Sequence, residues 1–203
     1  MTPTRRGRPR DTTVDERVLR IAADLIFRHG YTRLSIDEVA EQAGVAKTTL
    51  YRRWPTKDHL AVAVVARLQE DDEITETGDI RRDLTDYLTK VAAGLNRMRA
   101  AGRDDGHDDP SAGVAGEMVA AAARHDDIGA LARDLYERRN ALALAMIRRA
   151  CERGELRQDL DAGTLLDQLA GALYYRVLIT GARVDRAYAE RLVENALVGA
   201  ASP

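Results

Sequence analysis

The chain has 203 residues, of which 45% are hydrophobic and 32% are charged, and its formal net charge is −2. This composition fits a globular protein of one large or two small domains. No apolar run approaches the roughly 18 residues that a membrane span requires, and residues 1–6 do not lead into the apolar segment of a secretory signal. Cys151 is the only cysteine, which excludes an internal disulfide and favours a cytoplasmic protein without membrane contact.

Charge is distributed unevenly along the chain. Residues 1–60 contain 12 Lys/Arg and 8 Asp/Glu, a balance of +4, and the remainder is acidic with a balance of −6. The basic part begins with residues 1–12, whose arginines alternate with Gly7 and Pro9 and which have no apolar stripe to anchor a helix. We therefore expect a flexible basic arm at residues 1–12.

Apolar residues at helical spacing follow the arm. The stripe over residues 18–25 predicts an amphipathic helix from about residue 14 that stops at Gly30. Ser35 and Glu38 have the spacing of a capping box and open a second helix, which ends at Gly44.

The remaining pattern is also helical, so the predicted fold class is all-α. A third, short helix runs over residues 47–54 and ends before Pro55, after which Thr56 caps a longer helix. Further helices are expected at about residues 80–101, 111–124, 127–153, 162–180 and 185–199. The predicted organisation is a flexible basic arm (1–12), a three-helix helix-turn-helix domain (13–58) and a larger helical ligand-binding and dimerisation domain (59–203).

Residues 35–54 predict two short helices joined by a tight glycine turn, which is the layout of a helix-turn-helix. On a helical wheel of the second helix, Leu50 and Trp54 point into the domain. The opposite, outward face then consists of Thr48, Thr49, Tyr51 and Arg52.

This outward face has no carboxylate, and none occurs from Val45 to Thr56. Threonine can bond base edges and touch a thymine methyl, arginine can fork onto guanine or phosphate, and a tyrosine hydroxyl can bond a phosphate. The surface therefore suits a DNA major groove. The alternative is a solvated helix face that lacks acids by chance.

A longer pattern surrounds this face. It consists of Ala40, Ala-Gly-Val at residues 43–45, Thr-Leu-Tyr at residues 49–51, Trp54, and Pro-Thr-Lys at residues 55–57. With these motifs, residues 14–60 resemble the DNA-binding domain of the TetR/AcrR family of regulators. The resemblance covers about a quarter of the chain, and the rest agrees in length and helical layout alone.

The resemblance implies that residues 47–54 form the recognition helix, with Thr48 and Thr49 near bases and Tyr51 and Lys57 on phosphates. The N-terminus of the helix that Ser35 caps is a further phosphate partner. The candidate contacts with double-stranded DNA are Arg6, Arg8, Arg10, Ser35, Lys47, Thr48, Thr49, Tyr51, Arg52, Arg53 and Lys57.

The arm departs from many family members in its Arg-Gly-Arg-Pro-Arg string at residues 6–10. This string resembles an AT-hook-like reader of the minor groove, where arginine is favoured if the groove is narrow. The alternative is a solubilising tail that adds only nonspecific attraction to phosphates. The sequence leaves both interpretations open.

The resemblance also implies a ligand pocket behind the DNA-binding domain and a dimer interface built by the last two helices. Residues 165–179 are apolar on most sides of their helix, which predicts core contacts on one side and a partner subunit on the other; a helix internal to a monomer is the alternative. A homodimer would read the two half-sites of a palindromic operator. The candidate interface residues are Leu165, Leu169, Leu173, Leu192 and Ala196, and the candidate pocket residues are Tyr87, Met98, Met118, Tyr136, Asn140, Gln168, Tyr174, Tyr175 and Arg176.

The expected function is a DNA-binding regulator, a repressor released by an unidentified small-molecule inducer; an activator or a ligand-independent regulator is the alternative. The chain shows no catalytic triad, phosphate-binding glycine loop or spaced metal ligands, so no enzyme, cofactor or metal is expected. His107 is interpreted as part of a solvated Asp-rich loop and Cys151 as an inert thiol. A helical interaction module is a further alternative, which the acid-free face disfavours.

Overall fold

The structure, a computed structural model, describes residues 12–70, 75–100 and 114–199. In these ranges the chain is built of helices without a strand, and none of the helices is long and apolar enough to cross a bilayer. The predicted arm with Arg6, Arg8 and Arg10, and the loop that contains His107, lie outside the described residues. The helices are α1 (Thr12–His29), α2 (Ile36–Ala43), α3 (Lys47–Arg53), α4 (Lys57–Glu70), α5 (Ile80–Ala100), α6 (Val114–Arg124), α7 (Asp126–Glu152), α8 (Ala162–Tyr174), η3 (Tyr175–Ile179) and α9 (Arg186–Val198).

The turn between α2 and α3 follows from local sequence signals. Ser35 accepts a hydrogen bond from the Glu38 amide at 3.4 Å and so caps α2, whereas the Glu38 side chain accepts from Gln42 at 3.2 Å instead of closing the capping box. Gly44 ends α2 in the left-handed region, with φ 62° and ψ 37°. The amides of Gly44 and Val45 return to the last carbonyls of α2, so the chain reverses sharply into α3.

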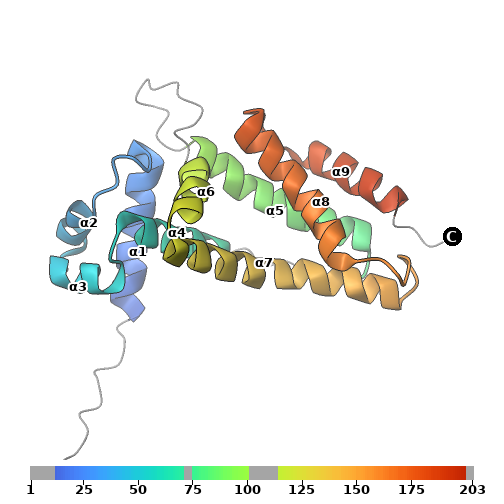
Figure 1. Cartoon of the computed structure of the whole chain (residues 1–203), viewed down its shortest axis with the longest axis horizontal. Coiled ribbons are helices and arrows are strands. Elements are labelled where there is room, and N and C mark those ends of the chain that lie inside the picture. The colour runs from blue at the N-terminus through green and yellow to red at the C-terminus, as the bar shows by residue number, and fades with distance from the viewer. Residues whose placement is uncertain (1–11, 71–74, 101–113, 200–203) are drawn as a thin grey trace, which may run out of the picture.

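The helices α1, α2 and α3 lie together at one end of the molecule (Figure 1). Their shared core is completed by α4 and by residues of α6 and α7, including Met118 and Ile128. The boundary expected after residue 58 falls in the first turn of α4, and the side chains of Leu60 and Val65 pack in this N-terminal core. The N-terminal helices are therefore fastened to the body by an apolar core.

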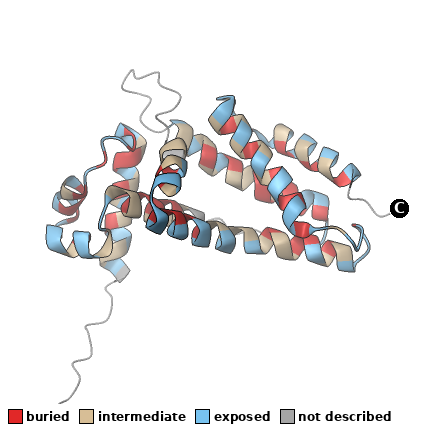
Figure 2. Cartoon of the chain, viewed as in Figure 1, coloured by how far each residue is buried: buried red, intermediate tan, exposed pale blue. Residues whose placement is uncertain are grey.

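A second core fills the body between α5, α7, α8 and α9. The buried carboxylate of Asp83 fixes the entry into α5, because it accepts hydrogen bonds from the Thr77 amide (2.9 Å), the Thr77 hydroxyl (2.6 Å) and the Gly78 amide (3.2 Å). Figure 2 shows buried positions on the inner sides of the body helices and exposed positions along α3.

The helix predicted over 162–180 is continuous in space but changes character. It is α-helical as α8, and its last five residues form a π-helical turn, η3, in which the Thr180 amide bonds the Tyr175 carbonyl at 3.1 Å. Leu165, Leu169 and Leu173 are buried in the core of the same chain. These three residues, which were expected at the dimer interface, are therefore covered by their own chain. The helix is exposed on a different side.

Candidate nucleic-acid interface and regulatory cavity

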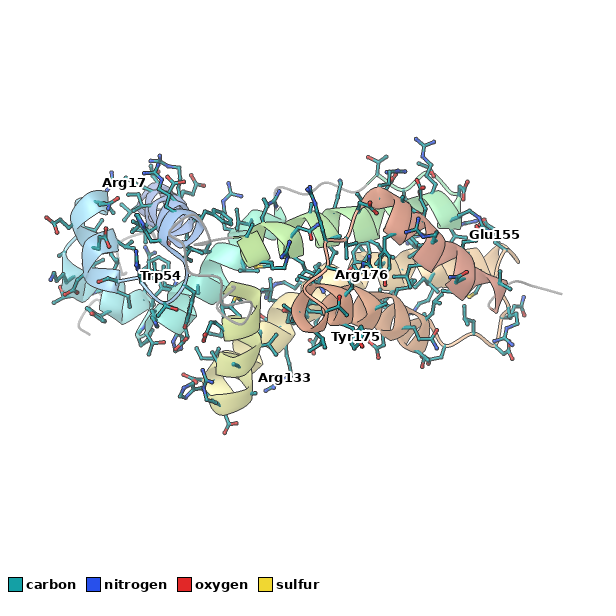
Figure 3. All side chains as sticks on the ribbon, turned by 90° about the horizontal axis from the view of Figure 1, so that it is seen from above. Arg17, Trp54, Arg133, Glu155, Tyr175 and Arg176 are labelled. Carbon is teal, nitrogen blue, oxygen red and sulfur yellow. The ribbon has the colours of Figure 1, made fainter. Side chains whose placement is uncertain are left out.

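The side chains of α3 divide as the helical wheel requires. Leu50 is buried and Trp54 is half-buried among the N-terminal helices, where Figure 3 labels it. The residues that point away from the domain are Lys47, Thr48, Tyr51 and Arg52, with Thr49 half-buried beside them. Tyr51 is 46% exposed, which is high for an aromatic residue and leaves its hydroxyl accessible.

One acidic side chain from α2 reaches this face. Asp37 accepts hydrogen bonds from Lys47 Nζ at 2.7 Å and from the Tyr51 hydroxyl at 3.2 Å. The hydrogen bond from Lys47 lowers the pKa of Asp37 below its ordinary value, and the same contact raises the pKa of Lys47. Sequence analysis missed Asp37 because this contact depends on how α2 and α3 cross.

Lys57 is held at the first turn of α4, next to the same surface. Its ammonium lies 4.6 Å from the centre of the Tyr31 ring and donates to the Thr32 carbonyl at 3.4 Å. The Tyr31 hydroxyl in turn donates to Asp58. Tyr31 thus positions the lysine, a role that sequence analysis did not assign.

Arg53 differs from the other basic residues of α3. It is half-buried, forms an ion pair with Asp15 of α1, and its guanidinium lies 6.0 Å from the Trp54 ring centre. In this structure Arg53 therefore joins α3 to α1, whereas Arg52 is exposed.

A cavity of about 210 Å³ lies between the N-terminal helices and the body. Its wall includes Phe27 of α1, Val65 and Leu68 of α4, and Met98 of α5. Tyr87 and Met98 are the only two of the nine sequence candidates that line it.

Three other pocket candidates form a polar cluster around Arg139, which also lines the cavity. Asn140 Oδ1 accepts from the Tyr87 hydroxyl at 2.9 Å and from Arg139 Nε at 3.2 Å. Arg139 also donates to the Tyr174 hydroxyl at 3.3 Å and stacks 4.7 Å from the Tyr136 ring centre. The aromatic pair Tyr136–Tyr174 meets edge to face at 6.1 Å.

The remaining pocket candidates lie away from this cavity. Met118 is buried in the N-terminal core, Gln168 is exposed on α8, and Tyr175 is 62% exposed on η3. Arg176 stacks 4.3 Å from the Tyr188 ring centre, against α9. Figure 3 shows Tyr175 on the outer side of η3.

The exposed side of α8 and η3 forms a stripe of its own. Thr164, Gln168, Gly171, Tyr175 and Ile179 are exposed at intervals of three or four residues. Ile179 is 72% exposed, and Val198 at the end of α9 is 74% exposed. Large apolar side chains so accessible to water mark a surface that a partner can cover.

A polar contact joins the N-terminal helices to the body. His59, near the start of α4, makes a contact of 3.2 Å from Nε2 to Asp127 Oδ2 at the start of α7, and its Nδ1 lies 2.8 Å from the Thr56 hydroxyl. Together with the apolar packing between α4 and α7, this contact connects the body to the helix that carries Lys57.

The fold and the exposed basic face of α3 define a helix-turn-helix protein of the DNA-binding class. Residues 18–64 match the family model described as bacterial regulatory proteins, tetR family, and residues 74–196 match the tetracyclin repressor-like C-terminal domain. The second match alone covers more than half of the chain, which therefore belongs to the TetR family of transcriptional regulators.

Similar proteins span nearly the whole chain. The DNA-binding transcriptional repressor TetR of Mycobacteroides abscessus is 31% identical over 193 residues, covering 93% of this chain and 94% of the relative. The uncharacterised regulator YdeS of Bacillus subtilis is 27% identical over 198 residues, covering 97% and 94%. The crystal structure of the TetR family transcription regulator SCO0332 has a TM-score of 0.72 and 34% identity, covering 92% of this chain and 97% of that chain.

Proposed function

We propose that this regulator binds operator DNA through α3, with Thr48 and Thr49 at base edges and Tyr51, Arg52, Lys47 and Lys57 on or near phosphates. The observation that carries the proposal is the exposed face of α3, which presents hydroxyls and cations from a helix that is fixed by Leu50 and the Gly44 turn. Such a helix can enter a major groove, while its flanking cations fix its register on the backbone. We omit Arg53 from the contacts because it is engaged by Asp15.

The regulator acts as a homodimer in this proposal. The exposed stripe of α8 and η3, extended by the half-buried Leu192 and Ala196 of α9, supplies the surface, and two copies would place two recognition helices on one palindromic operator. Leu165, Leu169 and Leu173 support that surface from beneath.

We also propose that the protein is a repressor whose operator binding is released by a small molecule. The similarity to the transcriptional repressor TetR of Mycobacteroides abscessus supports repression over activation. The cavity supports the release, because its walls come from α1 and α4 on one side and from α5 and α7 on the other. A ligand that prefers one arrangement of these helices shifts the separation of the recognition helices, and operator affinity changes by the same coupling free energy.

The test selects bound duplexes from a randomised pool with the purified protein and then titrates salt. We expect a palindromic sequence, and an affinity that falls about 10³–10⁵-fold between 50 and 200 mM salt if 6–10 phosphates are contacted. Thr48→Ala and Thr49→Ala should change the preferred sequence, whereas Lys57→Ala should weaken all duplexes alike. The absence of any preferred sequence would exclude operator recognition, and identical behaviour of the threonine and lysine variants would overturn the assigned roles.

A further inference from the structure

The cavity between the N-terminal helices and the body is apolar over most of its wall. Seven of its lining side chains are hydrophobic, and they come from α1 and α4 as well as from α5 and α7: Phe27, Val65, Leu68, Val91, Leu95, Met98 and Leu142. Its volume of about 210 Å³ exceeds the roughly 150 Å³ that accommodates benzene and falls below the roughly 300–1,000 Å³ typical of drug-sized ligands. The cavity therefore suits a ligand with one small ring or a short acyl chain.

The charged groups around this cavity all have one sign. Lys90, Arg97, Arg138 and Arg139 line it, and no Asp or Glu does so among the residues that the structure describes. Arg138 has its own carboxylate partner, Asp134, on the exposed side of α7. Arg139 has none in the described ranges, because its hydrogen-bond partners are the neutral side chains of Asn140 and Tyr174.

The neighbours of Arg139 orient its guanidinium without neutralising it. Burial raises the pKa of Tyr87 and Tyr136, so both hydroxyls stay protonated at neutral pH and supply no negative charge. Asn140 Oδ1 accepts from both Tyr87 and Arg139, and this contact fixes the Nε side of the guanidinium. A half-buried cation without a counter-ion is costly, and a carboxylate that bonds a guanidinium in two parallel contacts removes this cost.

We propose that the cavity between α1, α4, α5 and α7 binds a small carboxylate, an aryl or short acyl acid whose apolar part fills the cavity and whose carboxylate pairs with Arg139. Lys90, half-buried on the same wall, adds a second positive charge to the ligand's end. If this ligand is the inducer that releases the operator, the inference rests on the proposed function. Binding itself does not depend on that step.

The experiment uses the full-length protein and calorimetry with matched pairs: benzoate against benzamide, phenylacetate against phenylacetamide, and hexanoate against hexanamide. We expect at least one acid to bind tenfold or more tightly than its amide. Arg139→Gln should remove this advantage while leaving the weak amide binding unchanged, and Arg139→Lys should restore part of it, since the charge returns without the fork.

A second variant tests the location without touching Arg139. A Cβ added at Gly94 meets no atom within 4 Å, so Gly94→Leu projects into the cavity that this glycine lines and should abolish binding of acid and amide together. Ala93→Leu, at the adjacent exposed position of α5, is the control and should bind as the unmodified protein does.

The outcomes separate this inference from the proposed function. Equal affinity for acids and amides, no acid bound below 10 mM, or full binding by Gly94→Leu overturns the carboxylate site, even if operator binding is intact. An acid that binds through Arg139 but leaves operator affinity unchanged sustains the site and rejects its role in release. If the unmodified protein selects no preferred duplex, the proposed function is rejected, but the carboxylate site is not.

Discussion

Lys47 donates from Nζ to Asp37 Oδ2 at 2.7 Å, so the first residue of α3 is tied to the first turn of α2. The same carboxylate accepts from Tyr51 at 3.2 Å. Both donors are proposed to face phosphates, which means that DNA must displace Asp37 from them or bind beside it. In the free protein, the Asp37 carboxylate therefore occupies the two donors, Lys47 and Tyr51, that the phosphates of a duplex would bind.

Asp37→Asn should accordingly tighten binding to all duplexes. Because exposed ion pairs are weak, its removal is expected to raise affinity only modestly, by up to about fivefold, as measured by fluorescence anisotropy at fixed salt. Glu38→Gln is the control, because it removes the same charge from α2 at a side chain that bonds Gln42 and not α3. A gain as large in Glu38→Gln would mean that net charge, and not competition for Lys47, causes the effect.

The gain from Asp37→Asn should not depend on pH near neutrality. Because the hydrogen bond from Lys47 lowers the folded-state pKa of Asp37 below its ordinary value of 3.8, the contact is present above that value and is lost only as the pH falls through the lower folded-state pKa. The ratio of the two affinities should therefore stay constant from about pH 5 to pH 8. A ratio that changes within this range would show that another group controls the contact.

Arg52 and Arg53 are adjacent in sequence but should respond differently to replacement. Arg53→Gln breaks the half-buried pair with Asp15 and should lower the free energy of unfolding by about 1–2 kcal/mol, between the values for exposed and buried pairs. Arg52→Gln should leave stability unchanged and weaken DNA binding instead. Urea unfolding and duplex titration of both variants distinguish these outcomes; a stable Arg53→Gln with weak DNA binding would return Arg53 to the contact surface.

The helices and the α2–α3 turn could be predicted because their signals are local. Ser35 caps α2, Gly44 supplies a positive φ, and Asp161 and Asp185 cap α8 and α9 through their own side chains. Each signal acts within a few residues, so periodicity and capping chemistry locate the element without knowledge of its neighbours. The structure agrees with these expected helices to within a few residues at most ends.

The contacts that distinguish this site join distant parts of the chain and could not be predicted in the same way. Nothing near Arg53 in sequence indicates Asp15, and nothing near Arg139 indicates that Tyr174 lies beside it. The buried Leu169 of α8 illustrates the same limit, since an apolar stripe says that a face is covered but not whether its own chain or a partner covers it.

The hairpin of α6 and α7 depends on Gly129. A Cβ at this position would lie 2.8 Å from the Ala122 carbonyl oxygen of α6, a backbone atom that cannot move without shifting the helix. Gly129→Ala should therefore lower the free energy of unfolding by about 1–2 kcal/mol, even though alanine favours helix by about 1 kcal/mol. Gly94→Ala, where a Cβ meets open space, is the control and should be neutral or stabilising in the same urea titration. Equal effects would exclude the close approach of α6 as the cause.

The exposed stripe of α8 and η3 leads to the last prediction, which concerns assembly. Ile179 is 72% exposed on this stripe, and a charge at its position cannot be desolvated in an interface without loss of binding energy. Ile179→Glu should therefore weaken dimerisation at least tenfold in analytical ultracentrifugation. Operator affinity should fall with it, because a monomer holds only one half-site.

The control is Val119→Glu on α6, which introduces the same charge at a side chain that is 47% exposed and lies outside the stripe. This variant should remain dimeric and should bind the operator as the unmodified protein does. Circular dichroism of both variants should show the same helical content, since both positions are exposed. If Ile179→Glu stays dimeric while Val119→Glu dissociates, the subunits meet through α6, and the two recognition helices are spaced by that surface instead.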